Sequence, residues 1–156
     1  MPEPKYYWED FVVGETAVIG TKRVTRDEIL DFAAEYDPQP FHFDEEAARR
    51  SILGGLCASG WHSCAMVMRM MCDGFMLESA SLGAPGIEEV RWKKPVFVDD
   101  VVTLRRTCVG ARVSASRPER GLTHFSWELV NQHDETVMTM IGWIMFRLRH
   151  PAGDAA

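Results

Sequence analysis

The chain has 156 residues, of which 46% are hydrophobic and 26% charged, and its formal net charge is −6. This length suits one domain, and the hydrophobic share is large enough for a core, which excludes a disordered chain. The acidic balance gives no support to nucleic-acid binding, which usually needs a basic face. We therefore expect one domain over residues 1–150, followed by a disordered tail over residues 151–156.

The cysteines and the apolar segments indicate a cytoplasmic protein without a membrane span. Four cysteines occur without a CxxC pair, three of them at helical spacing in one apolar stretch: Cys57, Cys64 and Cys72, with Cys108 apart. Buried free thiols are expected, which suits a reducing compartment. The polar N-terminus lacks the apolar segment of a signal peptide. Arg69 and Asp73 interrupt the longest apolar region, so we expect a buried soluble helix there.

The first elements along the chain are a strand and a short helix. Residues 16–24 are rich in β-branched side chains, which favour a strand. Thr25 and Glu28 have the spacing of a capping box, in which each side chain binds the backbone N–H of the other residue. The apolar residues behind this pair share one face, so a helix is expected over residues 26–35.

Two prolines, Pro38 and Pro40, separate this helix from a second short one. Proline stops a helix and biases the preceding residue toward extended backbone, so we expect an extended loop here. Asp44 is a good N-cap residue, and the helix that follows it is expected over residues 45–50.

A long central helix is expected over residues 60–77, because this stretch is apolar on nearly every side. Such a helix must be surrounded by other elements. The rest of the chain is rich in β-branched and aromatic residues and is divided by short polar turns, which predicts four strands, over residues 86–98, 101–113, 123–132 and 136–148. One apolar helix followed by these strands predicts an α+β fold, with an antiparallel sheet wrapped around the central helix.

Asp37 and His42 are candidates for an acid–base pair between the two short helices. A carboxylate accepts a proton, and an imidazole donates or accepts one near neutral pH. A straight five-residue step would separate them by on the order of 16 Å, so the chain must bend if both are to hold one water. Spacing alone favours a structural interpretation, in which Asp37 caps a backbone amide and His42 packs on Phe43.

Ser59 and Gly60 stand at the start of the expected central helix. A helix N-terminus presents free N–H groups and the positive end of the helix dipole, and glycine lets a ligand approach the backbone. A thioester carbonyl placed there would be polarised. By itself, Ser59 is more simply an ordinary N-cap. His62, beside Trp61, is either a ligand contact or a hydrogen-bonded structural histidine.

Other classes of site have less support. The histidines share no metal-binding spacing, and the chain has no Gly-x-Ser-x-Gly segment, so neither a metal site nor a serine hydrolase is expected. Arg91, Lys93 and Lys94 form a basic run before Pro95. This run is most simply a solvated face, and it is also a candidate contact for the phosphates of coenzyme A.

Together these segments resemble the MaoC-like dehydratases, the family of (R)-specific enoyl-CoA hydratases with a hotdog fold. Residues 36–44, YDPQPFHFD, are similar to the family's hydratase motif, in which His follows Asp by five positions and Pro stands two before the His. Ser59-Gly60 falls where the family places a His-Gly pair. Residues 90–96, VRWKKPV, resemble the family's V-R-F-x-x-P-V strand, and the resemblance covers most of the chain.

The resemblance implies a single hotdog domain in which Asp37 and His42 activate water and the Gly60 N–H binds the thioester oxygen. The implied reaction is reversible syn hydration of a trans-2-enoyl thioester of coenzyme A to an (R)-3-hydroxyacyl thioester. No metal or redox cofactor is implied, since coenzyme A is part of the substrate. Family members are usually dimers, which implies a homodimer or a larger assembly of dimers. The expected substrate contacts are Gln39, Phe41, Ser59, Trp61 and His62.

Two positions depart from the family pattern, since Gln39 replaces the usual Asn and Ser59 the usual His. They weigh against the usual short-chain substrate and leave the hydratase interpretation in place. A hotdog thioesterase is the alternative enzyme, but it would usually need a carboxylate on the central helix, where Asp73 and Glu78 lie toward the far end. A non-catalytic acyl-thioester-binding protein is a third interpretation, and it would not need the acid–base pair.

Overall fold

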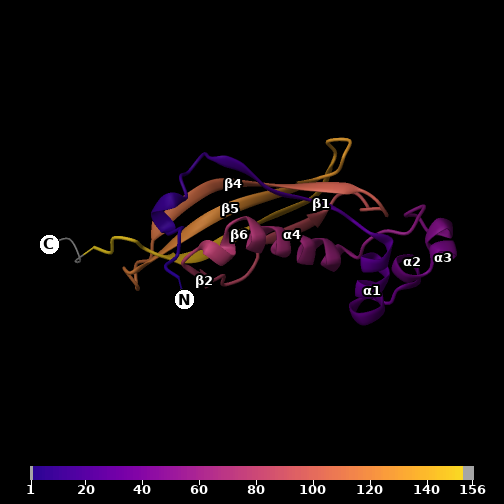
Figure 1. The fold of residues 1–156 in the computed structure, drawn as a ribbon, viewed down its shortest axis with the longest axis horizontal. Coiled ribbons are helices and arrows are strands. Elements are labelled where there is room, and N and C mark those ends of the chain that lie inside the picture. Colours follow the sequence, from indigo (N-terminus) through magenta and orange to yellow (C-terminus); the bar gives the residue numbers. More distant parts are fainter. Residues whose placement is uncertain (1, 153–156) are drawn as a thin grey trace.

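The computed structural model describes residues 2–152, in which one sheet curves along one long helix (Figure 1). The strands are β1 (Thr16–Arg23), β2 (Ser81–Gly83), β3 (Glu89–Trp92), β4 (Val101–Val113), β5 (Arg120–Val130) and β6 (Thr136–Arg147). The helices are α1 (Arg26–Tyr36), α2 (Pro40–Phe43), α3 (Glu45–Arg50) and α4 (Gly60–Gly74), with 3₁₀ turns η1 (Trp8–Asp10) and η2 (Met76–Glu78). The tail expected over residues 151–156 lies, from residue 153 onward, outside the described residues.

All pairings between the strands are antiparallel, in the order β1-β4-β5-β6-β2, and β3 also pairs with β6. The three long strands β4, β5 and β6 are consecutive in the chain and form the centre of the sheet. Along β5, buried and partly exposed residues alternate, as expected when one face of a sheet covers a core. The predicted α+β architecture, with an antiparallel sheet around a central helix, is confirmed.

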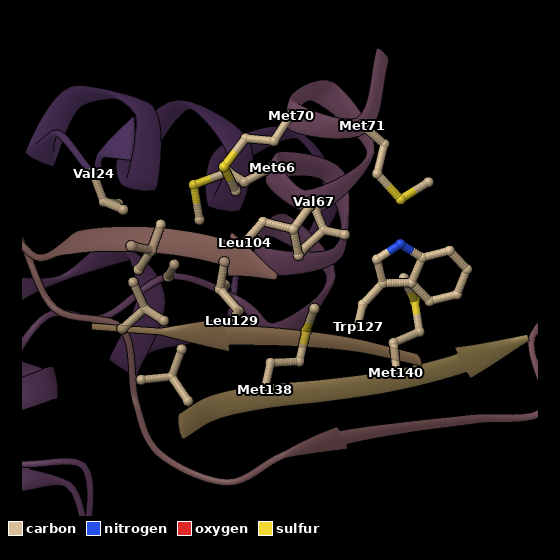
Figure 2. Close-up of a cluster of buried hydrophobic side chains, with 14 of the residues drawn as sticks. Val24, Met66, Val67, Met70, Met71, Leu104, Trp127, Leu129, Met138 and Met140 are labelled. Carbon is tan, nitrogen blue, oxygen red and sulfur yellow. The ribbon is translucent and has the colours of Figure 1, made fainter. Parts of the chain in front are cut away.

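The main core lies between α4 and the inner face of the sheet (Figure 2). Side chains of α4 that point to the sheet are mostly methionines, whose flexible thioethers fill irregular space. The facing side chains come from β4, β5 and β6. The buried residues labelled in Figure 2 from these elements are Met66, Val67, Met70, Met71, Leu104, Trp127, Leu129, Met138 and Met140. This packing fixes α4 against the sheet and therefore fixes where its N-terminus lies.

The expected extended loop between α1 and α3 is instead interrupted by the helical turn α2. Pro40 is the first residue of that turn, a position where the missing N–H of proline costs no hydrogen bond. The His42 N–H donates to the Gln39 carbonyl at 2.9 Å, and the Asp44 N–H donates to the Pro40 carbonyl at 2.8 Å. The second proline thus starts a helix where the sequence predicted only an extended chain.

Two other predicted elements are shorter in the structure. The central helix ends at Gly74 and continues as the 3₁₀ turn η2. The strand expected over residues 86–98 is reduced to β3, because the N–H groups of Lys93 and Lys94 both point to the Val137 carbonyl and Pro95 has no N–H to continue a ladder. Over residues 2–152, no helix has the length and apolar character that a membrane span requires.

Helix α4 is not covered on every side, although its composition predicted a surrounded helix. Trp61, Ala65 and Met68 follow helical spacing and form an outer stripe, in which Trp61 is 63% and Met68 46% exposed. Large contiguous patches of exposed apolar surface are typical of binding surfaces in soluble proteins.

Candidate active site

Asp37 and His42 lie side by side. Asp37 follows the last turn of α1, where its N–H donates to the Ala33 carbonyl at 3.0 Å, and His42 belongs to α2. The turn of α2 shortens the path between them, so that Asp37 Oδ2 lies 3.6 Å from His42 Nε2. Both side chains are largely buried. Helix α2 therefore provides the bend that the spacing required.

The second ring nitrogen of His42 determines which tautomer the neutral ring adopts. Nδ1 lies 2.9 Å from the Cys57 carbonyl oxygen, which can only accept, so Nδ1 carries the hydrogen. Nε2 is then an acceptor that faces Asp37 Oδ2. A water between these two acceptors would donate one hydrogen to each and turn an oxygen lone pair toward a ligand.

Both carboxylate oxygens of Asp37 accept a hydrogen bond from a side chain. Gln39 Nε2 donates to Oδ1 at 2.7 Å, and Ser59 Oγ donates to Oδ2 at 2.7 Å. Burial raises the pKa of the Asp37 carboxyl, but the hydrogen bonds from Gln39 and Ser59 and the nearby His42 together outweigh burial and hold that pKa below its ordinary value. Asp37 is therefore ionised at neutral pH.

The N-terminus of α4 has no side-chain cap. Ser59 occupies the N-cap position but makes no capping hydrogen bond, and its hydroxyl donates to Asp37. Within residues 2–152, no backbone carbonyl accepts from the Gly60 N–H. The first N–H groups of a helix have no intrahelical acceptor and carry the positive end of the dipole. The start of α4 can therefore bind a carbonyl oxygen on which negative charge develops.

Trp92 of β3 packs directly on Gly60. Its Nε1 donates to the Gly60 carbonyl at 2.9 Å, and a Cβ at residue 60 would lie 2.5 Å from Cε2 of the indole. Glycine is therefore required for this contact. Trp61 meets Trp92 edge to face, with 5.3 Å between ring centroids. In the sequence, Trp92 stood out only as part of the motif over residues 90–96, and that motif did not indicate a contact with Gly60.

A cavity of about 470 Å³ lies in front of these residues. Its walls come from α2 and the chain before it, the segment that leads into α4 with the start of that helix, the end of β3 with the segment that follows it, and Val137 of β6. The predicted site residues that line it are Asp37, Gln39, Phe41, His42, Gly60, Trp61, Lys93 and Lys94. Cys57 and Trp92, which had no predicted role, line it as well. Cys57 contacts His42 through its backbone carbonyl, which every residue type has, so the sequence could not predict this contact.

Two predicted substrate contacts do not line the cavity. Ser59 is 1% exposed and lies behind Asp37. His62 turns toward α1, where its Nε2 lies 3.3 Å from Glu28 Oε1 and its ring stacks on Phe32 with 4.8 Å between centroids. Burial lowers the pKa of His62, although Glu28 acts in the opposite direction. The structure therefore places His62 as a contact between α4 and α1.

The basic run divides between the cavity and the surface. Lys93 and Lys94 line the cavity, whereas Arg91 does not and pairs with Glu89 at 2.9 Å. Lys94 forms an ion pair with Glu135. Among the described residues, Lys93 is thus the member of the run that reaches the cavity without a carboxylate within ion-pair distance.

The other reactive groups near α4 do not form a hydrolytic site. Cys57 Sγ lies 3.8 Å from His42 Nδ1, but burial raises the pKa of its thiol to about 11, so it is protonated at neutral pH. Asp73 and Glu78 lie outside the cavity, whose acidic lining over residues 2–152 is Asp37. In that same part of the chain, no three His, Cys, Asp or Glu side chains are grouped to hold a metal ion.

Comparisons with solved structures identify the same fold. A MaoC-like dehydratase from Rhodospirillum rubrum is 35% identical with a TM-score of 0.86, and the match covers 93% of this chain and 99% of that chain. The (R)-hydratase from A. caviae involved in PHA biosynthesis is 22% identical with a TM-score of 0.66, and the match covers 90% of this chain and 98% of that chain. The latter likeness concerns the fold alone.

Curated relatives match shorter segments. Protein YdeM of Bacillus subtilis is 28% identical over 92 residues, which is 59% of this chain and 65% of YdeM. Mesaconyl-CoA hydratase of Cereibacter sphaeroides is 33% identical over 70 residues, which is 45% of this chain and 20% of that enzyme. The matches thus span less than two thirds of either relative.

The family model named "MaoC like domain" matches residues 12–124, which is more than half of the chain. This segment includes the acid–base pair, the start of α4 and the segment around Trp92. The chain therefore belongs to the MaoC-like dehydratase family and has the hotdog fold.

Proposed function

We propose that this protein is a hydro-lyase that reversibly adds water to a trans-2-enoyl thioester of coenzyme A to give an (R)-3-hydroxyacyl thioester. The observation that carries the proposal is the pair of acceptors, Asp37 Oδ2 and His42 Nε2, set 3.6 Å apart on a cavity that also contains the open start of α4. Membership of the MaoC-like family supports a hydratase or dehydratase. The mesaconyl-CoA hydratase among the relatives supports a CoA thioester.

The proposed reaction uses the two parts of the site together. The thioester oxygen accepts a hydrogen bond from the Gly60 N–H, which withdraws electrons from the double bond and makes C3 electrophilic. The water held by Asp37 and His42 attacks C3 while the pair accepts its proton, and the π electrons move to form an enolate at the thioester. The same pair then returns the proton to C2. Water and proton arrive from one face, so the addition is syn.

Charge around the cavity supports a phosphate-bearing substrate. Lys93 lines the cavity beside Trp92, and an ammonium group binds phosphate as a point charge. Lys94 lines the cavity too, although Glu135 already neutralises it. Of the three basic residues in this run, Lys93 is the one we expect to contribute most to coenzyme A binding.

The test is to add purified protein to crotonyl-CoA and to a branched enoyl-CoA. Ultraviolet absorbance of the enoyl thioester is expected to fall while no free thiol is released. Release of free thiol instead would identify a thioesterase, and tight binding without either change would identify a non-catalytic acyl-thioester-binding protein. Chiral analysis of the product separates the (R) from the (S) configuration.

We also propose that two copies pair as a homodimer. Within residues 2–152, β3 pairs with β6 on one side and has no strand on its other edge, which leaves a row of backbone groups for a partner. The outer stripe of α4, with exposed Trp61 and Met68, adds apolar surface near this edge. Light scattering is expected to give twice the chain mass, and Met68→Glu is expected to shift the protein toward the monomer.

A further inference from the structure

The hydroxyl of Ser59 occupies a position for which neither helix capping nor substrate binding accounts. A serine at an N-cap normally accepts a hydrogen bond from one of the first free N–H groups of its helix. Ser59 makes no such bond and instead donates to Asp37 Oδ2 at 2.7 Å. The residue is 1% exposed and does not line the cavity, so a ligand in the cavity does not reach its hydroxyl.

Gln39 acts on the other oxygen of the same carboxylate. Its Nε2 donates to Asp37 Oδ1 at 2.7 Å. Gln39 stands two residues after Asp37, beyond Pro38, so its longer side chain folds back over the short loop to reach the carboxylate. Together, the two donors hold both oxygens of Asp37 and fix the rotation of the carboxylate plane.

We propose that Ser59 and Gln39 are positioning residues that keep Asp37 as an oriented anion with Oδ2 facing His42, so that His42 carries the proton and Asp37 only accepts a hydrogen bond from the water. This inference rests on the proposed hydratase function, and it divides the roles within the acid–base pair. A carboxylate that is already bound by two donors is a weak base and has little tendency to take up a proton.

The groups around Asp37 agree with this division. His42 is the titratable side chain within ion-pair distance, at 3.6 Å, and its Nε2 is free to take a proton because Nδ1–H is bound to the Cys57 carbonyl. The other titratable groups on the cavity are the Cys57 thiol, held protonated by burial, and the ammonium groups of Lys93 and Lys94.

The direct test is a ¹³C NMR titration of the Asp37 carboxyl carbon, assigned by its absence in Asp37→Asn. In the unsubstituted protein, this carbon is expected to keep the chemical shift of an ionised carboxylate below the ordinary aspartate pKa of about 3.9. Ser59→Ala and Gln39→Met each remove one donor and are expected to raise the midpoint by about one pH unit. Circular dichroism at each pH verifies that the protein is folded.

The matched control is Ser79→Ala, because the Ser79 hydroxyl donates to the Met76 carbonyl at the other end of α4, at 2.8 Å. This variant is expected to leave the Asp37 titration unchanged. An Asp37 midpoint at or above the ordinary value, or one that neither Ser59→Ala nor Gln39→Met moves, would overturn the inference.

Kinetics gives a second, separate measurement. Ser59→Ala is expected to lower kcat about tenfold and to leave KM within about twofold, because the hydroxyl contacts Asp37 and not the substrate. A raised KM with normal kcat would show that Ser59 binds substrate, contrary to the inference. The titration needs no substrate, so it can succeed where no hydration is found and fail where hydration is normal, which keeps the two proposals distinguishable.

Discussion

Helices α1 and α4 both have a hydroxyl residue at the N-cap, Thr25 and Ser59, but only at α1 does that hydroxyl accept a hydrogen bond from a backbone N–H of the first turn. At α1, Thr25 Oγ1 accepts from the Glu28 N–H and Glu28 Oε2 accepts from the Thr25 N–H, so a capping box closes the helix. At α4, the hydroxyl of Ser59 donates to Asp37 and the first N–H groups stay open. Donation to a carboxylate does not by itself prevent capping, because the Thr25 hydroxyl also donates to Glu28 Oε2, at 3.0 Å, while it accepts from the Glu28 N–H. The difference is the direction of the hydroxyl, since Ser59 turns toward Asp37 and away from the first N–H groups of α4.

The two helix ends also differ in how well each can bind a ligand. A capped N-terminus such as that of α1 stabilises its helix, but it leaves fewer free N–H groups that could bind a ligand. The open N-terminus of α4 lies on the same cavity as Asp37 and His42, the proposed acid–base pair.

Substitutions in the acid–base pair are expected to have the largest effect on turnover. Asp37→Asn and His42→Ala should each lower kcat by about 10²-fold or more, since a positioned proton acceptor contributes about that much and Asp37 holds the water that loses the proton. Steady-state hydration of an enoyl-CoA measures the effect, with His133→Ala in the exposed turn after β5 as a control. A folded Asp37→Asn protein with normal turnover would mean that the open helix faces no working acid–base pair.

Gly60→Ala tests the open terminus itself. The added Cβ would lie 2.5 Å from the Trp92 indole, so either the indole or the start of α4 must move. We expect kcat to fall by about 10²-fold, the typical cost of losing one oxyanion donor. Gly60→Ala combined with Trp92→Leu removes the clash and should recover part of the loss.

The matched substitution at the closed terminus is Arg26→Ala, at the first residue of α1. It should leave turnover unchanged. Equal losses in Gly60→Ala and Arg26→Ala would remove the distinction between the two helix ends.

Thr25→Ala is expected to affect stability and not chemistry. It removes the hydroxyl half of the capping box, which should lower the free energy of unfolding by about 1 kcal/mol. Urea unfolding measures this change, and Thr25→Ser should restore most of the lost stability. Turnover per folded molecule should stay the same, and a selective loss of turnover would show that the start of α1 also serves the site.

The smallest expected effect concerns the pH dependence of the same cap. Burial raises the pKa of Glu28, but hydrogen bonds from Lys22 and Thr25 outweigh it and lower the pKa below 4.5. A carboxyl whose pKa is lower in the folded state adds stability above its unfolded pKa and loses it as pH falls through the folded one. The stability difference between the unsubstituted protein and Glu28→Gln, a few tenths of a kcal/mol, should therefore shrink between about pH 5 and pH 3.

Sequence patterns of short range predicted much of the fold and part of the site. The capping box of α1 is local, because Thr25 and Glu28 are three residues apart, and it is confirmed. The alternation along β5 and the apolar content of α4 likewise sufficed for an antiparallel sheet around a helix, although the uncovered outer stripe of α4 was not foreseen. The spacing of Asp37 and His42 made them candidates for a pair, but spacing alone favoured a structural interpretation and left the bend between them undetermined.

By itself, the sequence determined the residue types of the proposed acid–base pair, the glycine at the start of the central helix and the membership of the MaoC-like family. Only the tertiary structure decided that Ser59 donates to Asp37 instead of capping α4, and that His62 turns to Glu28 and away from the cavity. Each of these side chains had two possible partners, one local and one distant along the chain. Hydrogen bonds are short and directional, so the choice depends on which partner the packed helices bring within reach.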